Sequence, residues 1–360
     1  MIAEDELKIR ISIPYIIRLN LEEFMGTRLG KQTVRLDGKP VIQAWAAITG
    51  AKEGHGPLAR YFDDVIEDEY FGEKSFEKAE SKFVRETFAK ILSKGNVSPG
   101  DVQYIFAGDL LNQCIAVSYG IRETAIPFFG LYGACSTMAE SMSLGSMMVE
   151  GGFAERVVCI TSSHFCSAEK QFRFPLEFGS QRPPTAQWTV TGSGGVLLGR
   201  VGEGPRVVHI TTGKIVDMGI NDANDMGAAM APAACDTITA HFTETGLPQN
   251  HYDLIVTGDL GVHGKDLCIQ LLEENGVSIR ECYDDCGAMI YDTKEQQTDS
   301  GGSGCACSAT VLGGYLLEKL SKRELNRVLL VSTGALHSPT AIQQGESIPC
   351  IAHAVGIEMI

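Results

Sequence analysis

A long hydrophobic run is the first thing that the sequence lacks. A helix needs roughly 20 consecutive apolar residues to cross a bilayer, whereas the longest uncharged stretch, residues 300–317, opens with glycine and serine. The first residues carry acids where a secretory signal peptide carries bases. We therefore expect a soluble protein that reaches a membrane only through partner proteins.

Positive charge is the second deficit, because 30 Lys and Arg face 45 Asp and Glu and give a net charge of −15. Nucleic acids and anionic lipids bind surfaces with excess positive charge, so we exclude nucleic acid as a partner. The 11 cysteines are an odd number in a chain without a secretory leader, which argues against a disulfide framework and for a reducing, cytosol-like compartment. Their spacings fit no standard zinc site, and we expect no metal and no cofactor.

An internal repeat is the most informative feature that is present. Gly133 opens Gly-Ala-Cys-Ser-Thr and precedes the β-rich run at Arg156 by 23 residues, and Gly304 opens Gly-Cys-Ala-Cys-Ser and precedes Arg327 by the same 23 residues. Upstream of each copy, an apolar run ends in Gly-Asp-Leu, at 108–110 and at 258–260. We therefore predict duplicated βαβ halves and an α/β fold class with a mostly parallel sheet.

The repeat also sets the layout of the chain. We predict an N-terminal extension over residues 1–30, an N-terminal half over 31–205 and a C-terminal half over 206–360. Apolar spacing predicts a helix over 76–94, and the small side chains of 138–148 predict a buried central helix. The glycines of 192–195 predict a turn.

Cys135 is the first candidate for chemistry, because it lies where a predicted strand ends and the buried helix begins. The N–H groups and partial positive charge of a helix N-terminus favour a thiolate, which is a nucleophile. The alternative is a small apolar core residue, the usual state of a free cysteine.

The pattern around Cys135, inside a duplicated chain, resembles the thiolase-like superfamily of thiolases and ketoacyl synthases. The segments 129–136, 161–173 and 181–192 are similar to the stage V sporulation protein AD family of spore-forming bacteria. The resemblance implies a five-layered α-β-α-β-α subunit. It also implies a homodimer in which the strand over 156–162 pairs with its mate at the sheet edge.

The resemblance further implies binding of dipicolinic acid (pyridine-2,6-dicarboxylate), with or without calcium, and its transfer into the developing spore. The expected location is the cytoplasmic side of the forespore inner membrane, reached through membrane proteins of the same sporulation complex. Active relatives use the cysteine with a histidine and a third residue. Here His263 is the candidate histidine, and the turn that supplies Asn in one branch offers only Ser303 or Gly304.

This reduced catalytic set favours a binding protein over an enzyme. An acyltransferase or condensing enzyme that uses Cys135 and His263 is the alternative, and a purely structural dimer with a closed pocket is a third reading. A planar dianion needs convergent donors and cations. The expected ligand-binding residues are Cys135, Ser136, His164, Arg182, His263, Ser303, Gly304 and His337, although a loop arginine can instead serve only to balance nearby acids.

Overall fold

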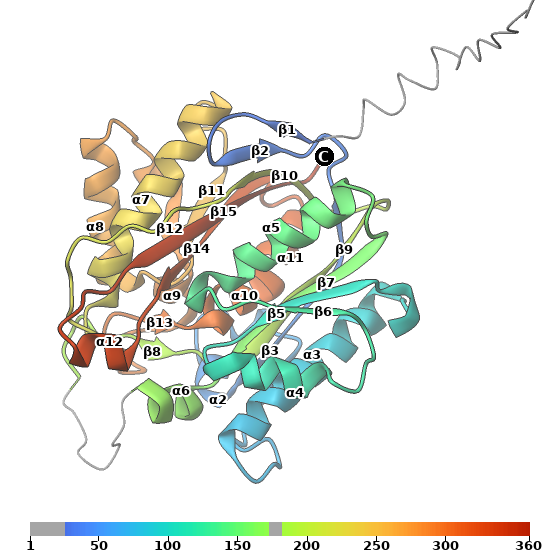
Figure 1. The fold of residues 1–360 in the computed structure, drawn as a ribbon, viewed down its shortest axis with the longest axis horizontal. Coiled ribbons are helices and arrows are strands. Elements are labelled where there is room, and N and C mark those ends of the chain that lie inside the picture. The colour runs from blue at the N-terminus through green and yellow to red at the C-terminus, as the bar shows by residue number, and fades with distance from the viewer. Residues whose placement is uncertain (1–25, 173–181) are drawn as a thin grey trace, which may run out of the picture.

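The computed structural model describes residues 26–172 and 182–360, and a long mixed sheet forms its framework (Figure 1). In chain order, the main strands of the first half are β3 (Val41–Gly50), β5 (Tyr104–Gly108), β6 (Phe128–Gly130), β7 (Arg156–Ser163) and β9 (Gly192–Gly199). Those of the second half are β10 (Arg206–Thr211), β11 (Leu254–Thr257), β12 (Tyr283–Asp285), β14 (Arg327–Ala335) and β15 (Cys350–Glu358). The sheet order is β12-β11-β14-β15-β10-β3-β9-β7-β5-β6.

The two halves of this sheet share one topology. If the five strands of a half are numbered along the chain, both halves have the order 1-5-4-2-3 outward from the β10–β3 junction. In both halves the fifth strand runs antiparallel to its two neighbours, whereas the fourth, second and third run parallel. The predicted duplication and the α/β class are confirmed.

Helices complete five layers. Outside the first half lie α3 (Phe76–Gly95) and α4 (Ile115–Ile121), and outside the second lie α7 (Met226–Thr245) and α8 (Gly261–Glu274). Between the halves lie α5 (Thr137–Glu150), α10 (Cys305–Val311) and α11 (Leu317–Ser321), as Figure 1 shows. The helices predicted over 76–94 and 138–148 are α3 and the buried α5.

Small side chains make the central layer possible. A Cβ on Gly145 of α5 would lie 2.7 Å from the Cys159 Sγ of β7, which is closer than packed atoms approach. Ser332 of β14 donates to Ser308 of α10 at 3.1 Å, so hydroxyl groups also link the central helices to the second half of the sheet. The helix that begins beside Cys135 is therefore fixed between both halves.

The remaining elements are short. The strands are β1 (Thr27–Arg28), β2 (Thr33–Arg35), β4 (Asp64–Ile66), β8 (Trp188–Thr189) and β13 (Gly302–Ser303), and the helices are α2 (Ala51–Gly54), α6 (Phe165–Phe172), α9 (Cys286–Ile290) and α12 (Pro339–Gln343). Within the described ranges, the helices are all too short or too polar to pass through a bilayer. Most of the proposed extension, residues 1–25, lies outside the described residues.

Two expectations from the sequence are wrong. The glycines of 192–195 form β9 rather than a turn, because the strand packs so closely on α10 that a Cβ on Gly194 would lie 2.3 Å from the Ala309 carbonyl oxygen. The strand over 156–162 is not a sheet edge, because β7 pairs with β5 on one side and with β9 on the other. The edges of the main strand path are β6 and β12.

Candidate functional site

A cavity of about 320 Å³ lies beside Cys135. Cys135 belongs to a 3₁₀ turn over Ala134–Ser136 that leads directly into α5. The other walls come from α6, from β8, from the start of α7, from Ser303 of β13, and from the segment 335–338 after β14. Segments from both halves of the chain thus meet at the N-terminal end of α5.

The polar neighbours of the Cys135 thiol are a hydroxyl and a carboxyl group. Cys135 Sγ lies 3.9 Å from Ser303 Oγ, and Ser303 Oγ donates to Asp259 Oδ2 at 2.8 Å. Asp259 Oδ2 also accepts from the Gly304 N–H at 3.1 Å, and Asp259 Oδ1 accepts from Thr333 Oγ1 at 2.6 Å. A hydrogen-bonded chain therefore leads from the cysteine through a serine to a buried aspartate.

This environment disfavours a thiolate. Burial raises the pKa of the Cys135 thiol well above its ordinary value, and the Asp259 carboxylate raises it further, while Ser303 and the Gly304 N–H oppose the shift. Burial likewise raises the pKa of Asp259, against hydrogen bonds from Thr333, Cys135, Ser303 and Gly304. The activation expected from the helix N-terminus is overridden, because desolvation and a nearby negative charge both favour the neutral thiol.

The duplicated Gly-Asp-Leu motifs have different roles in the two halves. In the first half, Asp109 accepts from the backbone N–H groups of Leu111 and Val117, both at 2.8 Å, and so organises the turn into α4. In the second half, Asp259 binds groups of the cavity wall instead. The Asp259 carboxylate therefore lies next to the cavity wall, whereas the Asp109 carboxylate stabilises a turn.

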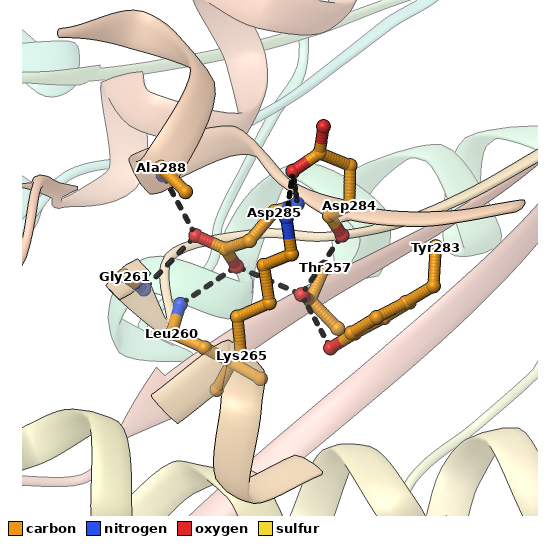
Figure 2. A network of polar contacts seen from close by, with 8 residues as sticks. All are labelled: Thr257, Leu260, Gly261, Lys265, Tyr283, Asp284, Asp285 and Ala288. Carbon is orange, nitrogen blue, oxygen red and sulfur yellow. Dashed lines mark hydrogen bonds and ion pairs between the residues drawn. The ribbon is translucent and has the colours of Figure 1, made fainter. Parts of the chain in front are cut away.

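Asp285 organises the turn that follows Asp259. Figure 2 shows its carboxylate accepting from the N–H groups of Leu260 at 2.8 Å, Gly261 at 2.9 Å and Ala288 at 3.1 Å, and from Thr257 Oγ1 at 2.8 Å. These donors oppose the burial that raises the pKa of Asp285 to about 7. The network joins the starts of α8 and α9 and holds the backbone next to Asp259.

The structure brings four of the sequence-predicted residues together. Cys135, Ser303 and His337 line the cavity, and Gly304 supplies the N–H that binds Asp259. His337 precedes α12, and its ring lies 5.6 Å from that of Phe172 with an angle of 64° between the ring planes.

Three other predicted residues lie outside the cavity lining. His263 is on α8 with 43% of its side chain exposed, and its Nε2 lies 3.7 Å from Asp225 Oδ2. His164 is buried, with Nε2 2.9 Å from the Glu69 carbonyl oxygen, and burial lowers its pKa. Ser136 Oγ donates to the Gly133 carbonyl at 2.7 Å. Each of the three side chains thus contacts a neighbouring protein group outside the cavity lining.

Arg182 lies outside the cavity lining and contacts residues that belong to it. Its guanidinium lies 3.4 Å from Asp299 and 3.7 Å from Glu169, and it donates to the Gln187 carbonyl. The Gln187 side chain in turn donates to the carbonyls of Asp259 and of Gly302, the latter at 3.1 Å. Arg182 is therefore partnered by carboxylates and positions Gln187, rather than lining the cavity itself.

Sequence reasoning missed Asp259, Gln187 and Glu169. The repeated Gly-Asp-Leu motif was the available signal for Asp259, because it marked a buried carboxyl at a strand end in both halves. No sequence signal distinguishes Gln187 or Glu169 from other polar loop and helix residues. Both line the cavity.

Comparisons with known proteins agree with this architecture. The family model described as stage V sporulation protein AD matches residues 30–358. The curated stage V sporulation protein AD of Bacillus subtilis (strain 168) is 44% identical over 329 residues, which is 91% of this chain and 97% of the relative.

Solved structures are similar in fold alone, each at 12% identity over 89% of this chain. A Xanthomonas campestris OleA crystal structure has a TM-score of 0.58 and is covered over 98% of its length. The 3-oxoacyl-[acyl-carrier-protein] synthase III of Aquifex aeolicus VF5 has a TM-score of 0.54 and is covered over 99%. The fold is thiolase-like, and the chain belongs to the stage V sporulation protein AD family.

Proposed function

We propose that this chain acts in sporulation as a binding protein for dipicolinic acid, which occupies the cavity beside Cys135 during uptake into the developing spore. Membership of the sporulation family supports the biological setting. The identity of the ligand is inferred from the resemblance of the pocket motifs to that family. The cytoplasmic side of the forespore inner membrane, with membrane proteins of the same complex as partners, is the proposed location.

The observation that carries the binding function is the identity of the groups next to the thiol. The Cys135 sulfur lies beside the Ser303 hydroxyl and the Asp259 carboxyl. A thiol is activated by a base that removes its proton and then holds a positive charge beside the thiolate, as imidazole does. A carboxylate cannot supply that positive charge. Acyl transfer through Cys135 therefore lacks its usual activation.

The size of the cavity also supports a small ligand. Its volume of about 320 Å³ lies at the lower end of the roughly 300–1,000 Å³ typical of small-molecule sites. A single aromatic ring with two carboxylates suits this space better than a long acyl chain. Ser303, Gln187 and His337 offer hydrogen-bonding groups along the wall.

The charge of the wall sets a condition on binding. Glu169 lines the cavity but lies 3.7 Å from the Arg182 guanidinium, whereas Asp259 lies directly behind Ser303. Repulsion between a bound dianion and the buried Asp259 carboxyl favours protonation of that carboxyl. We therefore propose that dipicolinate binds together with a proton.

We also propose a homodimer that forms through β6, because β7 is paired on both sides and is not a sheet edge. β6 is an edge strand whose three residues are all exposed. Phe129 of β6 is 47% exposed and Tyr132, which follows the strand, is 53% exposed. An exposed edge strand within an aromatic patch is a typical association surface.

Calorimetric titration with dipicolinate tests the binding function. Cys135→Trp should abolish binding because the larger side chain fills the cavity, and the matched Cys135→Ala variant should retain it. Benzene-1,3-dicarboxylate, which lacks the ring nitrogen, is the control ligand. Equal binding by the parent and Cys135→Trp proteins would place the ligand elsewhere. Acylation of Cys135 by an acyl-coenzyme A, followed by turnover, would favour the acyltransferase.

A further inference from the structure

A second concave surface lies on the outer layer of the C-terminal half, on the far side of the sheet from Cys135. It has a volume of about 560 Å³ and is formed by the loop 214–218, by one face of α7 and by the end of α8. Figure 1 shows α7 and α8 side by side on this outer face. We call it the α7 groove, lined by Lys214, Ile215, Val216, Met218, Pro232, Cys235, Asp236, Thr239, Ala240, Thr243, Glu244, Leu271 and Asn275.

The floor of the α7 groove consists mainly of small side chains. Pro232, Thr239, Ala240 and Thr243 follow one another along α7 at helical spacing. Small residues let another backbone approach closely, as helix packing requires. The shape therefore suits an elongated segment that lies along α7.

One wall of the groove presents apolar side chains from a fixed loop. The backbone of Val216 exchanges two hydrogen bonds of 2.8 Å with Cys350 of β15, and Asp217 accepts from Ser347 at 2.6 Å. Ile215 and Met218 nevertheless remain 62% and 66% exposed. A loop that is anchored between its two exposed apolar residues holds them ready for a partner, because less ordering entropy remains to be lost on binding.

The electrostatic character of the groove is acidic. Lys214, the single base among the described lining residues, pairs with Asp236 at 2.8 Å and is thereby neutralised. Asp217 and Glu274 are exposed at the rim, and Glu274 lies close enough to act electrostatically on Cys235 of the groove. The rim thus complements positive charge.

We propose that the α7 groove binds an amphipathic helix of another protein, with an apolar stripe flanked by Lys and Arg. Helices with apolar residues at positions i, i+3, i+4 and i+7 commonly dock in grooves of this kind. Cytoplasmic segments of membrane proteins carry an excess of Lys and Arg and so have the required chemistry. The inference is independent of the ligand in the cavity beside Cys135.

The test uses fluorescence anisotropy of the full chain with a labelled helical peptide of about 18 residues, long enough to form an isolated helix. Its apolar stripe is Leu and its flanks are Lys, and a control peptide has Glu in place of Lys. We expect the Lys peptide to bind, with an affinity that falls as salt rises, and the Glu peptide to bind at least tenfold more weakly. Equal binding of the two peptides would overturn the proposal.

Variants locate the binding surface. Ile215→Ser combined with Met218→Ser should weaken the Lys peptide at least tenfold, whereas Val201→Ser, which changes another exposed residue (69%) outside the groove, should not. The circular dichroism spectrum and the thermal unfolding midpoint of the double variant should match those of the parent protein, which shows that it is folded. Unchanged peptide affinity in the double variant would overturn the proposal. Dissociation of a dimer by the double variant would instead assign the groove to a second copy of the chain and would also overturn it.

Discussion

Asp259→Asn gives the sharpest prediction, because this carboxyl lies one hydrogen bond behind the cavity wall. Ser303 Oγ is 2.8 Å from Asp259 Oδ2, and a ligand carboxylate that accepts the single Ser303 proton in place of Asp259 would lie about 5–6 Å from Asp259. At an effective dielectric constant of about 20, two unit charges at this distance repel by about 3 kcal/mol, or roughly 100-fold in affinity.

The sign of the pH effect follows from the raised pKa of Asp259. The carboxyl is neutral below that pKa and charged above it, so dipicolinate affinity should fall as pH rises through the pKa of Asp259. Asp259→Asn removes the charge at every pH. Above the pKa of Asp259, the variant should therefore bind more tightly than the parent protein, by up to the same roughly 100-fold, and it should show a flatter pH profile.

Isothermal titration at several pH values, in buffers of different ionisation enthalpy, measures both affinity and proton uptake. Asn offers an N–H₂ group where Asp259 now accepts from Gly304, which should lower the free energy of unfolding by about 1–3 kcal/mol. Glu53→Gln is the control, because Glu53 is a buried carboxyl with a raised pKa outside the cavity lining. Parallel pH profiles for the parent and Asp259→Asn proteins would refute the reasoning.

Three further predictions concern the fold and its assembly. Gly304→Ala should lower the free energy of unfolding by about 1–3 kcal/mol in urea titrations, because Gly304 has φ +104° and a Cβ there would lie 2.6 Å from Ser163 Oγ; a neutral effect would mean that this turn is not tightly constrained. Burial lowers the pKa of His241 to about 3, below the unfolded value of about 6.5, so protons bind preferentially to the unfolded chain and stability should fall as pH drops from about 6.5 toward 3. His241→Gln should make this loss shallower in pH-dependent unfolding, and an unchanged slope would assign the acid sensitivity to other groups. Phe129→Asp should convert the proposed dimer to a monomer in sedimentation velocity, whereas a parent protein that already sediments as a monomer would contradict the β6 interface.

Local sequence patterns predicted the framework well. The equal spacing from Gly133 to Arg156 and from Gly304 to Arg327 spans a turn, the central helical segment and the connection to the next strand, and this arrangement recurs in both halves. Apolar periodicity located α3, because helix burial leaves a repeating trace in the sequence. The glycines of β9 led to a wrong prediction of a turn. The strand needs glycine there because α10 packs closely against it, and this tertiary contact leaves no local pattern in the sequence.

The site was only partly predictable for the same reason. Cys135 and Ser303 stand in recognisable turns, but the choice between Asp259 and His263 depends on where α8 begins. Because the helix starts at Gly261, Asp259 remains in the turn that faces the cavity, whereas His263 is carried onto the helix near Asp225. Asp259, which lies beside the pocket, and His263, which is exposed, are therefore only four residues apart in the chain.

The central claim is that Cys135 belongs to a binding pocket and not to an acyl-transfer site. The most direct test is the intact mass of the protein after incubation with acetyl-coenzyme A, measured beside a dipicolinate titration of the same sample. We predict saturable dipicolinate binding and an unchanged mass. An acetyl adduct on Cys135, together with no dipicolinate binding, would contradict the account.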